Sequence, residues 1–104
     1  TYFARWTTAH PVQIEKAMVE AMQHKGFSVV EIVSQCPTGA GRNMFGTDSG
    51  YEIMDMFKKT YTPLKPGETP DIMNTTGRLG TFINVSKPTF LDNMDRIMGE
   101  RSAK

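Results

Sequence analysis

Cysteine is almost absent from this chain: one occurs among 104 residues, and it is Cys36. A single cysteine excludes an internal disulfide, and it is too few for a zinc or iron–sulfur site built by this chain alone. Low cysteine content fits a reducing compartment, so we expect a cytoplasmic protein.

The chain also lacks a charge excess and long apolar runs. Its 12 basic and 11 acidic residues leave a formal charge of +1, which provides no electrostatic reason to expect a nucleic acid or an anionic membrane as partner. The apolar runs are too short to span a bilayer. The sequence starts in strand-like residues without an initiator methionine, and we therefore expect a fragment of a longer protein.

The first third of the sequence predicts a β-α-β unit. Residues 1–6 alternate weakly, as in a short strand, and Pro11 is placed to open a helix. Gly26 is expected to close that helix as a left-handed cap. Residues 27–33 are rich in β-branched side chains and predict a central, parallel strand.

The remainder predicts less regular structure. A glycine-containing loop follows Cys36, and Ser49 and Glu52 have the spacing of a capping box that opens a second helix. Residues 79–85 predict an edge strand, and Pro88 is expected to open a last helix.

These elements predict an α/β fold, a few-stranded sheet with flanking helices. We divide the chain into an α/β portion (1–61), an extended connection with three prolines (62–77), and an edge strand with the C-terminal helix (78–104).

Cys36 stands at the C-terminal mouth of the predicted parallel strand, the edge at which open α/β sheets bind ligands. Its thiol is a metal ligand, a nucleophile or a packed apolar group, and position alone favours the last. A nucleophile needs a base, and His10 and His24 are the only histidines. We assign no catalytic residue.

Other polar residues accompany the cysteine. Thr7, Thr8 and His10 follow the first strand and would share the edge with Cys36; they either line a site or cap the helix. The stretch Gly39-Ala40-Gly41 lacks the spacing of a dinucleotide-binding loop and is read as a flexible turn. Arg42 could bind an anion there, although loop arginines are most often solvated.

Two segments, residues 2–11 (YFARWTTAHP) and 25–38 (KGFSVVEIVSQCPT), together resemble a known family. They are similar to the C-terminal part of the β subunit of 2-oxoacid:ferredoxin oxidoreductases, closest to the 2-oxoglutarate branch. The resemblance is specific over the first half of the chain, weakens across residues 61–76, and partly returns at 80–82 and 87–90.

The resemblance implies a thiamine diphosphate-binding α/β domain, with Mg²⁺ and one [4Fe–4S] cluster. The family's diphosphate motif and three cluster cysteines lie upstream and are absent here. Cys36 is similar in position to the fourth cluster cysteine, and the resemblance implies that it ligates the cluster. Ser34, Gln35 and Thr38 would then donate hydrogen bonds near the cofactor that adjust its potential.

The implied reaction is the oxidative decarboxylation of a 2-oxoacid with coenzyme A, with electrons passed to ferredoxin. The implied partners are the remainder of the β subunit, the α subunit and ferredoxin, and the isolated chain is expected to be inactive. Two other hypotheses stay open: a stand-alone interaction module that docks a partner through methionine-rich faces, and a small thiol enzyme built on Cys36.

Overall fold

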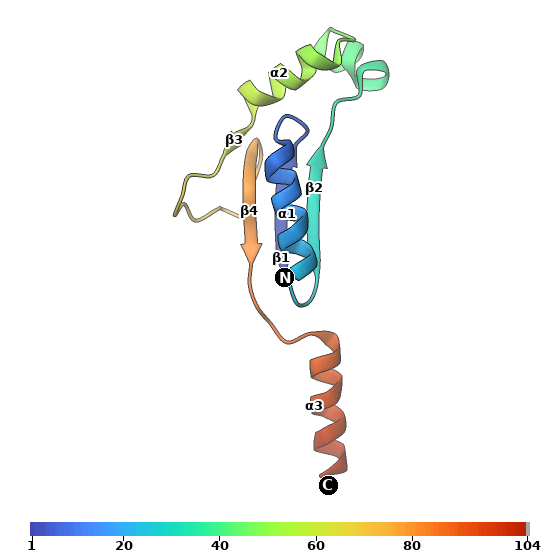
Figure 1. Ribbon diagram of the computed structural model, residues 1–104, viewed down its shortest axis with the longest axis vertical. Helices are drawn as coiled ribbons and strands as arrows, with labels where there is room; N and C mark the ends of the chain where they lie inside the picture. The colour runs from blue at the N-terminus through green and yellow to red at the C-terminus, as the bar shows by residue number, and fades with distance from the viewer. Residues whose placement is uncertain (104) are drawn as a thin grey trace.

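The computed structural model describes residues 1–103 and shows a mixed four-stranded sheet with the order β2-β1-β4-β3. The predicted α/β class with flanking helices is confirmed (Figure 1). The elements, in chain order, are β1 (Tyr2–Thr7), α1 (Pro11–Gln23), β2 (Ser28–Val33), the π-helical segment η1 (Pro37–Phe45), α2 (Gly50–Thr60), β3 (Thr62–Pro63), β4 (Arg78–Asn84) and α3 (Phe90–Ser102).

The β1-α1-β2 unit contains the best-defined core. The two strands are parallel and in register from Tyr2 opposite Ser28 to Thr7 opposite Val33, as the sequence predicts. Tyr2, Ala4 and Ala17 form a buried cluster where α1 lies on the sheet. The Tyr2 hydroxyl donates to Glu20 Oε2 of α1 over 2.8 Å, so the one polar atom of this aromatic core residue is satisfied.

The end of α1 differs from the prediction. The helix ends at Gln23, and the next residue, His24, has an extended backbone with ψ of 125°. At this point the centroid of the His24 ring lies 6.0 Å from that of the Tyr2 ring. Gly26 is therefore no helix cap; its φ of 116° serves the turn into β2.

The positions of two strands in the sheet were predicted wrongly. β2 is an edge strand rather than a central one, and β4 lies between β1 and the short β3 rather than at an edge. β4 runs antiparallel to β1, with a register shift between Phe3 and Ala4. Its apolar residues Leu79 and Phe82 are buried. Hydrophobic content predicts burial but does not say which neighbour supplies it, and here the connection through β3 returns β4 to the free side of β1.

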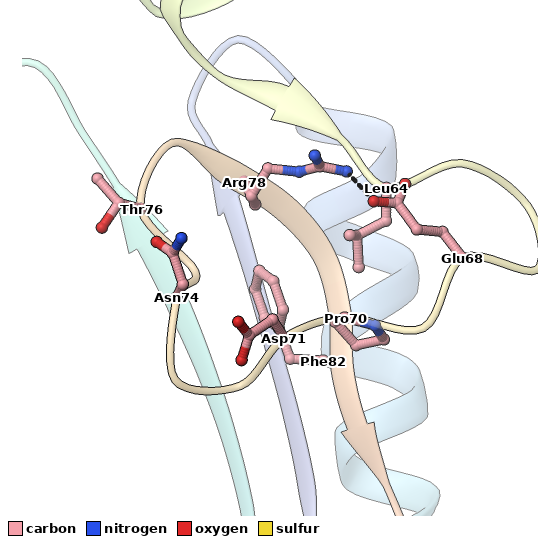
Figure 2. Close-up of a pocket in the computed structure, with 8 residues that line it drawn as sticks. All are labelled: Leu64, Glu68, Pro70, Asp71, Asn74, Thr76, Arg78 and Phe82. Atoms are coloured by element: carbon pink, nitrogen blue, oxygen red, sulfur yellow. Dashed lines mark hydrogen bonds and ion pairs between the residues drawn. The ribbon is translucent and has the colours of Figure 1, made fainter.

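The connection that precedes β4 is more ordered than its sequence indicates. β3 pairs in parallel with the start of β4, and the N–H of Leu64 donates to the carbonyl oxygen of Leu79 over 2.8 Å. Arg78 and Glu68, joined by an ion pair of 2.6 Å, both line a small cavity of about 160 Å³ (Figure 2). Gly80, with φ of 136°, lies where a Cβ would meet Leu64 Cδ1 at 3.1 Å.

Helix α3 extends away from the sheet (Figure 1). It begins at Phe90, two residues later than the predicted start at Pro88, because Thr89 is the N-cap and forms a capping box with Asp92. An ion pair of 3.0 Å between Lys25 and Asp92 ties its first turn to the α1–β2 turn. No residue of α3 is buried. Its apolar face is exposed: Phe90, Leu91, Met94, Ile97 and Met98.

Candidate functional site at the carboxyl edge of the parallel strands

The carboxyl ends of β1 and β2 meet at one edge of the sheet, as expected for parallel strands. Thr8 follows β1, and its hydroxyl donates to Gln35 Oε1, two residues after β2. The Thr8 N–H also donates to the carbonyl oxygen of Val33 over 3.0 Å. The structure thus joins the two segments that the sequence places together, with Cys36 as the next residue along.

Thr7 and His10 are engaged with each other rather than with Cys36. Thr7 is buried, and its hydroxyl oxygen lies 2.8 Å from His10 Nδ1. Burial, with a smaller contribution from the charge of Lys58, lowers the pKa of His10, so its neutral form is favoured. His10 occupies the N-cap position of α1 but makes no side-chain capping bond. These residues shape the turn between β1 and α1.

Cys36 is exposed and stands at the N-cap of η1. Its carbonyl oxygen accepts hydrogen bonds from the N–H groups of Ala40 (3.1 Å) and Gly41 (2.9 Å). The second of these bonds spans five residues and defines the π-helical turn where the sequence predicts an irregular loop. The backbone N–H groups of Ala40 and Gly39, aided by the Thr38 hydroxyl, lower the pKa of the Cys36 thiol. The local backbone therefore favours the thiolate.

Two glycines allow this turn to close. A Cβ on Gly39 would lie 3.0 Å from the Cys36 sulfur. A Cβ on the buried Gly41 would lie 2.5 Å from the carbonyl oxygen of Thr47 and 3.2 Å from Ile53 Cδ1 of α2. The expectation of a merely flexible turn is thus replaced by a closely packed one, and sequence reasoning missed Thr47 and Ile53 as its supports.

The other predicted site residues lie in different settings. Ser34 is exposed at the end of β2, and Thr38 is exposed inside η1. The side chain of Gln35 accepts from Thr8 rather than turning to the thiol. Arg42 pairs with Asp48 over 2.8 Å, so its charge is already compensated.

The donor set fits an iron–sulfur cluster as one ligand of several. An exposed, thiolate-favouring cysteine is suited to bind iron. Within residues 1–103, no three His, Cys, Asp or Glu side chains gather in a way that could hold a metal ion. Further ligands would have to come from outside the described part of the chain.

No helix within the described range is both long enough and apolar enough to cross a membrane.

The fold and the edge site define an α/β protein with a parallel β-α-β unit and a thiol at its carboxyl edge. No family model matches the chain, and no solved structure matches it. Curated proteins do match. The chain is 32% identical over 100 residues to the 2-oxoglutarate synthase subunit KorB of Methanocaldococcus jannaschii, a match that covers 94% of this chain and 37% of that protein.

Two further relatives carry the same name. The chain is 33% identical over 106 residues to KorB of Methanothermobacter marburgensis, covering 100% of this chain and 37% of that protein. A match to KorB of Archaeoglobus fulgidus reaches 63% identity over 38 residues, which is 36% of this chain and 14% of that protein. The chain is similar to KorB subunits and spans about 37% of the length of the two longer matches. The resemblance found in the sequence is confirmed.

Proposed function

We propose that this chain is part of the β subunit of a 2-oxoglutarate:ferredoxin oxidoreductase, an enzyme that oxidatively decarboxylates the 2-oxoacid with coenzyme A and passes electrons to ferredoxin. The single observation that carries the proposal is homology to KorB subunits over nearly the whole chain. The choice of 2-oxoglutarate among the 2-oxoacids follows the printed name of those relatives.

Cys36 is the residue of this chain that would ligate the [4Fe–4S] cluster. Two features support that role: the thiol is exposed at the carboxyl edge of the parallel strands, and nearby N–H groups lower its pKa, which favours the thiolate that iron requires. The cluster, when bound, would supply one-electron transfer. Thiamine diphosphate and Mg²⁺ would be held mainly by parts of the subunit outside this chain.

The remainder of the β subunit and the α subunit are the partners we propose. The exposed apolar face of α3 is compatible with cover by such a partner. Ferredoxin would accept the electrons.

The test uses the full-length enzyme, purified without oxygen from its native source or expressed with all its subunits. We expect Cys36→Ser to abolish the electron paramagnetic resonance signal of the cluster, because a serine hydroxyl replaces the thiolate ligand. Coenzyme A-dependent reduction of methyl viologen with 2-oxoglutarate should fall at least a hundredfold.

A matched control is Met44→Ser. It also exchanges a sulfur-containing side chain for serine within η1, at a residue whose side chain is 73% exposed. The control should retain the iron and the activity. Cys36→Ser enzyme that keeps a full cluster and wild-type turnover would contradict the assignment.

An interaction module is the second candidate, favoured by the exposed apolar face of α3. It predicts a parent protein that contains no iron and turns over no 2-oxoacid. The thiol-enzyme hypothesis has less support, because His10 bonds to Thr7 and His24 lies against Tyr2, so neither is bonded to the Cys36 thiol.

A further inference from the structure

The sheet has two faces, and the core with α1 occupies one of them. Tyr2 and Ala4 of β1 belong to that core. Because side chains alternate along a strand, Phe3 and Arg5 lie on the opposite face. There the centroid of the Phe3 ring lies 5.4 Å from that of Phe82 on β4. Phe82 is only 5% exposed, so a segment other than α1 must cover it.

The connection between β3 and β4 supplies this cover, and we call residues 64–77 the strap. Leu64 and Pro70 of the strap line the same small cavity as Phe82 (Figure 2). Leu64 also packs on β4 so closely that a Cβ on Gly80 would lie 3.1 Å from Leu64 Cδ1. The first end of the strap is therefore held by apolar packing against the sheet.

The other end of the strap is held by Arg5. Its Nη1 donates to the carbonyl oxygen of Thr75 over 2.8 Å and to the hydroxyl oxygen of the same residue over 3.3 Å. Its Nε donates to Glu31 Oε2 of β2 over 2.7 Å. The guanidinium carbon lies 5.5 Å from the ring centroid of Phe82 and 5.9 Å from that of Phe3. The Arg5 side chain is 18% exposed, so these charge-assisted bonds form largely out of water.

The middle of the strap lacks such ties to the sheet. Among the described residues, the hydrogen bonds made by 69–74 stay within the strap: the N–H groups of Met73 and Asn74 both donate to Asp71. A segment that is bonded to the body mainly at its ends opens locally at a lower cost than one bonded along its length. The closed position of the strap therefore depends on its two ends.

We propose that Arg5 is the latch of a strap that opens and closes over the Phe3 and Phe82 face of the sheet. Loss of the bonds from Arg5 to Thr75 releases the second end of the strap, while the β1-α1-β2 unit stays folded. Opening uncovers the aromatic pair, so the latch controls how much apolar surface this face presents. The inference goes beyond the proposed function and does not depend on it.

The test is hydrogen exchange, measured by mass spectrometry on the full-length subunit in its native complex. Arg5→Lys keeps the positive charge beside Glu31 but removes the planar guanidinium that bonds Thr75 and Glu31 together. We expect the Arg78 amide, which donates to the carbonyl oxygen of Thr75, to exchange about tenfold faster or more, the effect of losing a hydrogen bond to a charged group. Exchange in residues 28–33 should not change. Wild-type exchange at Arg78 in this variant would overturn the proposal.

Arg42→Lys is the matched control. Arg42 also forms a 2.8 Å ion pair, with Asp48, but it belongs to η1 and makes no recorded bond to the strap. The same chemical exchange at this position should leave the Arg78 amide at its wild-type rate.

Leu64→Ala tests the other end of the strap and leaves Arg5 intact. It should speed exchange at the Leu64 and Glu68 amides, because the packing on Gly80 is lost, while the Arg78 amide stays protected. This variant decides if Arg5→Lys does not fold. Retained protection at Arg78 supports a separate latch at that end, and simultaneous opening of both ends rejects it.

Discussion

Gly41 occupies the most restricted backbone position in η1. A Cβ there would lie 2.5 Å from the carbonyl oxygen of Thr47, and a carbonyl is not a flexible group that could move aside. Because no positive φ is recorded at Gly41, the obstacle is steric and not conformational. The residue joins the Cys36 turn to α2.

We expect Gly41→Ala to destabilise η1 by about 1–3 kcal/mol, the usual cost of overpacking. Hydrogen exchange at the Ala40 and Gly41 amides of the full-length protein measures this as a loss of protection. Gly50→Ala, whose Cβ has room, should leave exchange at these amides unchanged. Equal protection in Gly41→Ala and wild type would show that Thr47 moves freely, contrary to the packing described.

Among the elements, α3 depends most on its own first turn. Among the described residues, the only ion pair between α3 and the rest of the structure joins Asp92 to Lys25. The capping box of Thr89 and Asp92 forms the N-terminus of the helix. Hydrogen bonding by the Thr89 N–H, followed by bonds to Lys25 and the Thr89 hydroxyl, lowers the pKa of Asp92 to about 2. The charged form of Asp92 is the form that the folded helix start favours.

A pH dependence follows from the lowered pKa of Asp92. A carboxyl group with a depressed folded pKa stabilises the structure above its unfolded value of 3.8, and this stability is lost as the pH falls toward about 2. We expect the α3 amide chemical shifts to be constant from neutral pH down to about 4 and to move toward coil values between about 4 and 2.

Asp92→Asn is the control for this titration. It should remove the acid transition in α3 and leave a more frayed helix start at neutral pH. A wild-type transition in α3 that persists in Asp92→Asn would assign it to another carboxyl group.

The local sequence predicted some helices and strands correctly but not the position of every strand in the sheet. Pro11 marks the start of a helix between two strand-like segments, so the β-α-β unit could be predicted. The Thr8–Gln35 contact follows once the strands are parallel. By contrast, the edge position of β2 depends on where β4 returns, over 40 residues later, and no local pattern in residues 27–33 encodes it.

The candidate site around Cys36 could likewise be predicted only in part. The place of Cys36 at the strand mouth follows from the sequence pattern. The packed turn does not, because it depends on the five-residue bond from Gly41 to Cys36 and on contacts with Thr47 and Ile53. Three glycines in a stretch indicate freedom of the backbone, whereas here at least two provide space for neighbouring atoms.

The whole molecule is elongated. It measures 67 × 31 × 25 Å, and its radius of gyration is 18.8 Å, against about 13 Å for a compact chain of this size. The projecting α3 accounts for much of this length (Figure 1). Such a shape leaves large apolar side chains in solvent, including Phe27, Met73 and Phe90, each at least 70% exposed.

We expect the isolated chain to bind the dye ANS and to self-associate, because its apolar faces lack the cover that a partner would supply. Light scattering and dye fluorescence measure both effects. Leu91→Lys combined with Ile97→Lys should reduce dye binding by adding charge to the exposed face of α3. A monomeric isolated chain without dye binding would count against this expectation.

The pairing of β1 with both β2 and β4 has a consequence for the order of folding. Tyr2 meets Ser28 after a loop of 26 positions, but it meets Asn84 only after 82. Closing the longer loop costs about 1 kcal/mol more in chain entropy. The β1-α1-β2 unit should therefore form first and present the open side of β1 as a template, and β4 should join later. Until β4 arrives, that open strand is the point at which the growing polypeptide is most exposed to pairing with the wrong neighbour.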